Sequence, residues 1–274
     1  MDAVVHTSLE SFDAVAHDRL AADPVRNTVA LTSLDRIRRL PGEPTPTLIT
    51  FHDNGEVIGS LVRTPPWPFQ TADLPLAAVE LAVKIAVEVD PEAPGVTGPR
   101  ERSEAFATAT GKDFTESLTT RLYRLGTLAP PVAEGSGRLA TEDDVELLVA
   151  WRHAFLKEAV PEAPAGPTAE AMRGSLRLGN GHALWEINGT PVAWAVASLP
   201  HAGMTRVGPV YTPPEHRKHG YGAAVTAMVT QWALDQGATA VLLFTDLSNP
   251  ISNSIYQRIG YQPLDDWAEF WWKR

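Results

Sequence analysis

The sequence has no cysteine, and this absence excludes several kinds of chemistry. Without thiols the chain cannot form disulfides, use a cysteine nucleophile or bind a metal through thiolates. Long apolar runs are also missing, because no window approaches the roughly 18 apolar residues that a membrane-spanning helix requires. The first ten residues are mixed in character and lack the basic and then apolar pattern of a secretory signal. We therefore expect a cytoplasmic protein that has no membrane partner.

Positive charge is also scarce, since 23 basic residues face 33 acidic ones and the formal net charge is −10. A chain that binds nucleic acid needs a positive field, so no nucleic-acid partner is expected. The same negative field attracts cationic amines, and a polyanionic ligand would need a local cluster of cations. His216 and His219 lie three residues apart in a loop, and this spacing does not predict a metal site.

One crossover unit is readable near the C-terminus. A short apolar segment over 207–211 predicts a strand, and Pro209 within it predicts a bulge or splay because proline has no N–H to donate. The apolar periodicity over 223–236 predicts an amphipathic helix. The continuous apolar run over 240–245 predicts a parallel strand that is covered on both faces.

The loop between this first strand and the helix has the composition of a phosphate site. A helix start leaves about four backbone N–H groups unpaired and carries a partial positive charge. Gly220 and Gly222 remove the side chains that would keep a pyrophosphate away from the backbone. Arg217 and Lys218 add positive charge, and His219 adds hydrogen-bond donors.

Other nucleotide loops fit this segment less well. A dinucleotide fingerprint needs a tight turn directly after the strand and a third small residue, whereas here residues 212–218 intervene and Val225 fills the third place. A nucleoside-triphosphate loop needs Gly-Lys-Ser/Thr, which does not follow the glycines. A glycine pair that only lets a loop turn into a helix is the structural alternative.

A second pattern follows over 249–261. Asn249 followed by Pro250 predicts a helix start, and Gly260 predicts its end. The spacing predicts two faces on this helix, a buried stripe of Ile251, Ile255 and Ile259 and a polar face of Asn249, Ser252, Asn253 and Tyr256. A polar face just after a buried parallel strand is a typical ligand position.

Together the two patterns resemble the GNAT superfamily of acyl-CoA N-acyltransferases. The resemblance covers about residues 139–274, and the residues that carry it are Val210, Tyr211, Arg217, Gly220, Gly222, Asn249, Tyr256, Gly260 and Tyr261. It implies that acetyl-CoA is the co-substrate and that an amine attacks its thioester, with Tyr256 as the general acid that protonates the leaving sulfur. The expected cofactor-binding residues are Val210, Tyr211, Arg217, Lys218, His219, Gly220, Tyr221, Gly222, Asn249 and Asn253.

The general base is less clearly indicated. An alkyl ammonium has a pKa near ~10.4 and cannot attack until it loses a proton. Glu186 is the first candidate, because residues 183–187 predict a strand that ends at the Asn188-Gly189 hairpin turn. An exposed strand charge is the plain structural interpretation of Glu186. Glu158, on the first helix of this half with Trp151 and Phe155, is the other candidate.

The length of 274 residues allows two domains. An Asn54-Gly55 hairpin, helices over 76–89 and 101–110, and a strand over 117–125 predict a degenerate copy of the same architecture. Residues 95–99 echo 207–209, but residues 100–105 contain no glycine, so no cofactor is expected there. The expected role of this copy is structural, or it walls one side of a substrate cleft. The predicted division is a degenerate GNAT-like domain over 1–128, a linker over 129–138 and a catalytic GNAT domain over 139–274.

The predicted fold class is α/β with tandem GNAT-like domains, the second with a splayed central mixed sheet flanked by helices. The first functional hypothesis is an N-acetyltransferase that acts on a primary amine of a small molecule or peptide. A non-catalytic acyl-CoA-binding sensor of the same fold is the second hypothesis, and a nicotinamide enzyme on a doubly wound sheet is the third. The oligomeric state stays open, a homodimer included.

Overall fold

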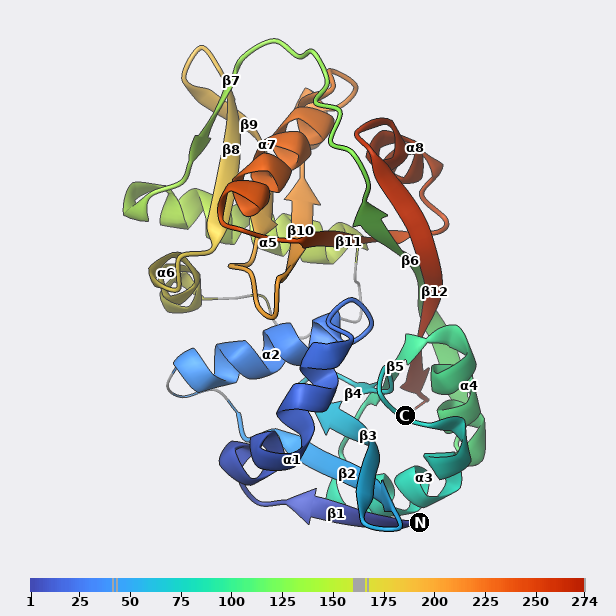
Figure 1. Cartoon of the computed structure of the whole chain (residues 1–274). Coiled ribbons are helices and arrows are strands. Elements are labelled where there is room, and N and C mark those ends of the chain that lie inside the picture. Colours follow the sequence, from blue (N-terminus) through green and yellow to red (C-terminus); the bar gives the residue numbers. More distant parts are fainter. Residues whose placement is uncertain (41, 43, 160–165, 167, 274) are drawn as a thin grey trace. The chain divides into compact units, whose positions relative to one another are not determined.

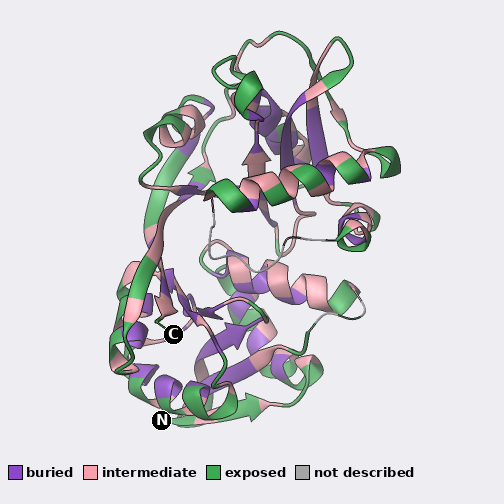
Figure 2. Ribbon diagram, turned by 180° about the vertical axis from the view of Figure 1, so that it is seen from behind, coloured by how far each residue is buried: buried purple, intermediate pink, exposed green. Residues whose placement is uncertain are grey.

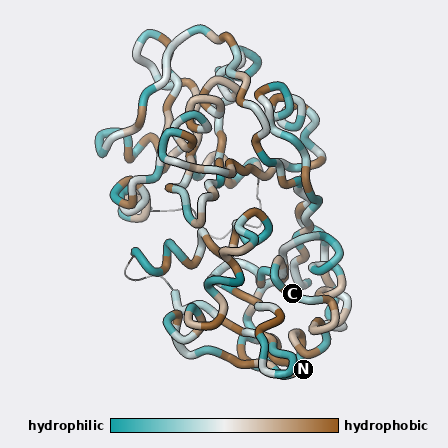
Figure 3. The backbone as a smooth tube through the Cα atoms, in the orientation of Figure 1, coloured by the Kyte–Doolittle hydropathy of each residue, from teal (hydrophilic) through white to brown (hydrophobic). Residues whose placement is uncertain are grey.

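The computed structural model describes residues 1–40, 42, 44–159, 166 and 168–273 (Figure 1). The chain divides into two compact units: residues 1–120 with 265–274 form the N-terminal unit, and residues 121–264 form the C-terminal unit. In both units, hydrophobic stretches alternate with hydrophilic ones along the chain (Figure 3). Among the described residues, no helix has the length and hydropathy needed to cross a membrane.

The N-terminal unit is a mixed sheet with helices. Its elements in chain order are β1 (Asp2–His6), α1 (Leu9–Ala22), α2 (Thr28–Arg39), β2 (Thr47–Asp53), β3 (Glu56–Arg63), β4 (Phe69–Gln70), the 3-10 helix η1 (Leu76–Ala78), α3 (Val79–Val89), β5 (Gly95–Pro99), α4 (Arg100–Ala109) and β6 (Phe114–Leu125). The strands follow the order β1-β2-β3-β4-β5-β12-β6, in which β12 is Tyr261–Trp272 and β4 and β5 are parallel. Asn54 and Gly55 both have positive φ, so the predicted hairpin between β2 and β3 is confirmed.

A buried ion pair ties β3 to the end of α3 in this unit. Arg63 Nη1 lies 2.8 and 2.7 Å from the two carboxylate oxygens of Asp90, and its Nε donates to Trp67 O at 2.9 Å. The side chains of Arg63 and Asp90 are only 8% and 12% exposed. Arg63→Met should therefore lower the free energy of unfolding by about 3–5 kcal/mol, because it leaves a carboxylate buried without its cation. Equilibrium unfolding in urea measures this change.

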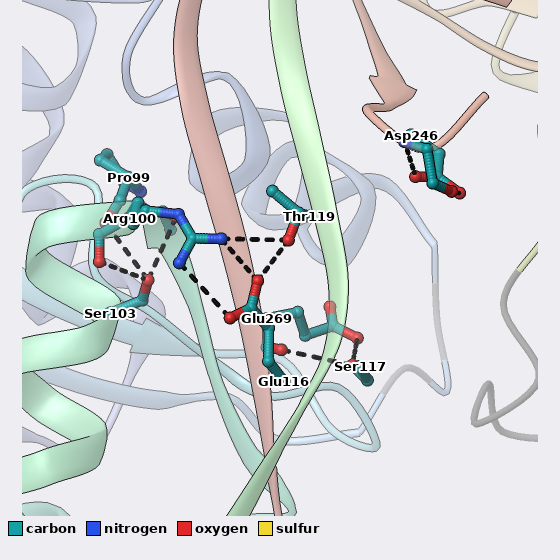
Figure 4. A network of polar contacts seen from close by, with 10 residues as sticks. Pro99, Arg100, Ser103, Glu116, Ser117, Thr119, Asp246 and Glu269 are labelled. Carbon is teal, nitrogen blue, oxygen red and sulfur yellow. Dashed lines mark hydrogen bonds and ion pairs between the residues drawn. The ribbon is translucent and has the colours of Figure 1, made fainter. Parts of the chain in front are cut away.

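Arg100 provides the matched control in the same unit (Figure 4). Its guanidinium contacts Glu116 at 2.5 Å and Thr119 at 3.1 Å, but the two charged side chains are each 39% exposed. Arg100→Met should cost less than about 1 kcal/mol, because water replaces an exposed ion pair. If the two variants lose the same free energy of unfolding, burial does not determine how much these ion pairs contribute to stability.

The C-terminal unit also combines parallel and antiparallel strands with helices. Its elements are β7 (Ser136–Leu139), the 3-10 helix η2 (Glu142–Asp144), α5 (Val145–Ala159), α6 (Ala169–Arg177), β8 (Gly181–Ile187), β9 (Thr190–Ala197), β10 (Met204–Tyr211), the 3-10 helix η3 (Pro214–His216), α7 (Tyr221–Asp235), β11 (Ala240–Asp246), α8 (Pro250–Arg258) and β12 (Tyr261–Trp272). The strand order is β12-β6-β11-β10-β9-β8-β7. Figure 2 shows β8 and β9 largely buried, whereas the helices keep exposed outer faces.

Strand β10 has the irregularity that Pro209 predicts. Its parallel pairing with β11 runs from Met204 to Val207, and its antiparallel register with β9 shifts between Val207 and Val210. Residues 208–211 therefore lie beyond the paired part of β10 and β11, so the two strands splay at the carboxyl end of β10. This confirms the splayed central sheet of the predicted fold class.

The two units repeat one order of elements, which confirms the predicted tandem architecture. In the N-terminal unit β2, β3, β4, α3, β5, α4 and β6 follow each other as β8, β9, β10, α7, β11, α8 and β12 do in the C-terminal unit. The prediction that residues 95–99 are structurally equivalent to residues 207–209 is wrong. Residues 95–99 form β5, which pairs in parallel with β4 as β11 does with β10, so β4 is the counterpart of β10. The Gly-Pro pair in each segment suggested an equivalence that the strand pairing does not support.

The unit boundaries differ from the predicted domain boundaries. The long strands β6 and β12 each contribute residues to both units, so the division falls at 120/121 and 264/265 rather than in a linker over 129–138. Residues 136–139 form β7, which pairs with β8. Prolines and glycines around residue 130 indicate a loop correctly, but a loop that follows a shared strand is not a domain boundary.

Candidate active site

The loop after β10 leads directly into the N-terminus of α7. Gly220 is the N-cap residue of α7, with φ +85° and no side-chain cap, and Lys218 also has positive φ, at 68°. A Cβ atom on Gly220 would have no neighbour within 4 Å, so glycine is needed here for backbone conformation rather than for space. Ala224 N donates to Gly220 O, and the preceding amides of the first turn have no carbonyl one turn earlier. The predicted phosphate-binding segment therefore adopts an anion-accepting geometry.

Two side chains on this loop, those of Arg217 and His219, are oriented by neighbours. Arg217 Nε donates to Thr212 O at 2.9 Å, and Arg217 Nη2 lies 2.6 Å from Glu158 Oε2 at the end of α5. The side chains of Arg217 and Glu158 remain 43% and 45% exposed. His219 is exposed and stacks on the Tyr221 ring, with centroids 5.4 Å apart. Arg217 and His219 thus stay accessible to a ligand beside the helix start.

The end of β10 provides the predicted Val210 and Tyr211. Val210 is half-buried, and Tyr211 is buried with its ring 6.1 Å from that of Trp151 on α5. Burial raises the pKa of Tyr211, and the nearby negative charge of Glu158 adds to this shift. The backbone of these two residues lies beyond the paired part of β10 and β11, where its polar groups can meet a ligand.

Helix α8 begins as the sequence predicts, and both of its asparagines have structural partners. Asn249 Oδ1 accepts from Ser252 N at 3.0 Å. Asn253 Nδ2 donates to Asp246 O at 2.9 Å and to Asn249 O at 2.8 Å, while its Oδ1 accepts from Tyr123 Oη at 2.9 Å. The Asn253 amide therefore fixes the start of α8 against β11 and β6. Tyr123 was not predicted as part of this site, because in an alternating strand it has no distinguishing sequence signal.

Tyr256 lies on α8 with its ring partly buried. The ring packs edge-on against Tyr261 at 6.3 Å and, like Val210, borders the core cluster beneath α7. Desolvation raises the pKa of Tyr256 to about 12. Within the described part of the chain no protein group hydrogen-bonds its hydroxyl, whereas Tyr261 Oη contacts Thr230 Oγ1 at 2.7 Å. The Tyr256 hydroxyl is thus a protonated donor that a ligand can use.

Glu186 lies near the end of β8, as predicted, but in an ion pair. Its Oε1 accepts from Arg138 Nε at 2.8 Å, and Arg138 also contacts the two carboxylate oxygens of Asp144 at 2.7 and 2.8 Å. The two carboxylates raise the pKa of Arg138 and keep it charged. The Glu186 carboxylate is therefore already engaged by a cation within its own unit.

The matching loop of the N-terminal unit has the opposite charge arrangement. Asp73 follows β4 and accepts from Arg19 Nε on α1, with both oxygens at 3.1 Å. In the C-terminal unit the loop supplies the cation, Arg217, and the first helix supplies the anion, Glu158. Residues 71–78 contain no glycine, and a carboxylate in this place disfavours a phosphate.

Comparison with known proteins agrees with this geometry. Residues 146–261 match the family "Acetyltransferase (GNAT) family". A mycothiol acetyltransferase from Arthrobacter sp. (strain FB24) is 33% identical over 75 residues, which are 26% of this chain and 23% of that protein. The aligned segment thus spans about a quarter of that relative.

Solved structures resemble the whole chain. A GCN5-related N-acetyltransferase from Kribbella flavida superposes with a TM-score of 0.60 at 22% identity, covering 91% of this chain and 96% of that one. A tandem GNAT protein from the clavulanic acid biosynthesis pathway gives 0.59 at 14% identity, covering 98% and 97%. These likenesses establish a tandem GNAT fold. The match over residues 146–261 is to a family of acetyltransferase enzymes, whose co-substrate is generally acetyl-CoA. Among the described residues, no group of three or more His, Asp or Glu side chains is placed to hold a metal ion.

Proposed function

We propose that the C-terminal unit transfers the acetyl group of acetyl-CoA to a primary amine of a small molecule or peptide. The observation that carries this proposal is the Tyr256 hydroxyl, which no described protein group hydrogen-bonds and whose ring packs against the same core cluster as the first turn of α7. The amine nitrogen attacks the thioester carbonyl directly, and the carbon–sulfur bond breaks. Tyr256 donates its proton to the departing sulfur and so prevents the reverse reaction.

The remaining roles follow from the placement of each residue. The amides from Lys218 to Gly222 hold the pyrophosphate at the start of α7, and Arg217 and His219 add charge or donors beside it. The backbone of Val210 and Tyr211 binds the pantetheine arm and polarises the carbonyl. Tyr221 backs the loop through its stack with His219, and Asn249 and Asn253 keep α8 and its tyrosine in place.

Two carboxylates remain candidates for the base. The ion pair with Arg138 weakens the case for Glu186, because transfer of a proton to it would cost that interaction. Glu158 is also paired, but its partner Arg217 belongs to the phosphate loop and has a second anion to bind once the co-substrate is present. Its charge acts on Tyr211, at the end of the strand where the carbonyl is expected. The pH–rate profiles of Glu158→Gln and Glu186→Gln identify the base. The variant that lacks the base no longer shows the fall in rate at acidic pH that the wild type shows.

Glu158→Gln should also tighten CoA binding by about fivefold at most, because an exposed carboxylate no longer competes with phosphate for Arg217. Titration calorimetry with CoA measures the change. Glu215→Gln removes another exposed carboxylate of the same loop and should have a smaller effect. Weaker CoA binding by the Glu158 variant would mean that this carboxylate holds Arg217 in its binding orientation instead.

Thiol release from acetyl-CoA across an amine library tests the proposed function. An enzyme releases thiol in the presence of particular amines, whereas a sensor of the same fold binds CoA and releases none. A thermal-shift comparison of CoA with NAD tests the dinucleotide alternative. Stabilisation by CoA without amine-dependent thiol release would overturn catalysis, and stabilisation by NAD alone would overturn the choice of co-substrate.

A further inference from the structure

Helix α5 carries a cation on the side that faces the sheet. Val145, Leu148 and Leu156 are its buried residues, and Arg152 stands four residues after Leu148 and four before Leu156. Residues at this spacing share one face of a helix, so the half-buried Arg152 lies on the same face as the buried stripe. Its guanidinium lies over the Phe155 ring, 5.4 Å from the centroid. A charged side chain thus occupies a position that the helix otherwise fills with apolar residues.

Among the described residues, this guanidinium has no anionic partner. Within the part of the chain that the structure describes, Arg152 makes no hydrogen bond or ion pair, whereas Arg63 and Arg138 each contact carboxylates. Burial lowers the pKa of Arg152 to about 10, and no neighbouring charge offsets this shift. An isolated, desolvated cation is costly, and one ring contact recovers only part of the cost. Such a group is retained where a ligand supplies the missing charge.

A second donor without a partner lies on the same face of the sheet. Trp194 of β9 is 1% exposed, packs with Val145 and Leu148, and no group bonds its buried Nε1 in the described chain. In the strand register Trp194 is opposite Tyr211, the last residue of β10. Tyr211 packs against Trp151, the neighbour of Arg152 in sequence. Both unused groups are donors, Trp194 on β9 and Arg152 on α5, the helix that packs against this face of the sheet.

We propose that Arg152 binds a carboxylate of the acceptor, so that the acceptor is an amine of the amino-acid type. This inference rests on the proposed acetyl transfer. A planar guanidinium matches a carboxylate with paired hydrogen bonds, which a neutral amine cannot use. A chain with a net charge of −10 repels anionic acceptors at long range, so selection of a carboxylate needs a local cation.

The test compares standard amino acids with their carboxamides as acceptors, with thiol release as the readout. The carboxylate form should be preferred, and Arg152→Met should lower its kcat/KM by about 10- to 100-fold while the carboxamide is unaffected. Arg177→Met removes an exposed cation from the same unit and should leave kcat/KM unchanged for both the carboxylate and the carboxamide acceptor. The inference would be overturned if Arg152→Met lowered kcat/KM equally for amino acids and their carboxamides. It would also be overturned if the wild type did not prefer the amino acids.

Two readouts do not depend on turnover. Ligand-free Arg152→Met should melt at a higher temperature than the wild type, because methionine removes a half-buried charge that no described residue pairs, whereas a structural arginine would give a lower melting temperature. Calorimetry with N-acetyl amino acids, with and without CoA, should show binding that the variant loses and that N-acetyl amino acid amides lack. If no amine releases thiol, the acetyl-transfer proposal fails, and this binding comparison still decides the role of Arg152. If N-acetyl amino acids did not bind the wild type, the carboxylate-binding role of Arg152 would be overturned.

Discussion

Tyr256→Phe is expected to lower turnover about a hundredfold while leaving the affinity for acetyl-CoA nearly unchanged. General acid catalysis contributes about 10²–10⁴, and the lower end applies because burial raises the pKa of Tyr256 to about 12, far above that of a thiol. The substitution removes only a hydroxyl that no described protein group contacts, so the fold loses no hydrogen bond. Single-turnover thiol release and calorimetry with CoA measure the two quantities separately.

The control for Tyr256→Phe is a second tyrosine in ring contact with the first. Tyr261 is buried and its hydroxyl contacts Thr230, so Tyr261→Phe should lower stability by about 1 kcal/mol and leave turnover unchanged. The pH–rate profile is a further check, since a Tyr256 acid gives no falling limb until the pH approaches about 12. Unaltered turnover in Tyr256→Phe would remove this residue from the mechanism.

Local rules of backbone chemistry are enough to predict the hairpins and the cap near the site. Asn188-Gly189 turns between β8 and β9 with positive φ at both residues, and Asn249 caps α8 through Ser252 N. Helix α1 was not predicted, although a signal exists: Ser8 caps it, and Phe12, Ala16 and Leu20 form its buried stripe. The hairpin turn, the cap of α8 and the signal for α1 all depend on residues that are close in sequence. One sequence therefore contains the information needed to predict them.

Features that depend on distant partners could not be predicted in this way. Ile251 was expected in a buried stripe with Ile255 and Ile259, but it is 69% exposed while Ile259 is 2% exposed. A spacing of four residues drifts by about 40° per step on a helix of 3.6 residues per turn, so Ile251 lies about 80° from Ile259. Whether a rotation of this size takes Ile251 out of the core depends on which elements pack against α8. Likewise, no local sequence feature of Arg152 or Glu186 indicates that, among the described residues, only Glu186 has an ion-pair partner.

Gly220→Val is expected to weaken CoA binding by about a hundredfold or more without unfolding the chain. The residue has φ +85°, where a β-branched side chain is strained, so the N-terminus of α7 must change its backbone. A Cβ atom would meet no atom within 4 Å, so the cost to the fold is only the conformational one. The amides of the first turn would then no longer converge on one phosphate.

The far end of the same helix provides the control. Gly237 follows α7 with φ +88°, and a Cβ atom added there would also meet open space, so Gly237→Val imposes the same backbone strain away from the phosphate loop. Both variants should lose comparable stability in thermal melts, and only Gly220→Val should lose CoA affinity in calorimetry. Pantetheine, which lacks the diphosphate, should bind equally weakly to both. Tight CoA binding by Gly220→Val would place the diphosphate elsewhere, and with it the origin of the affinity for the co-substrate.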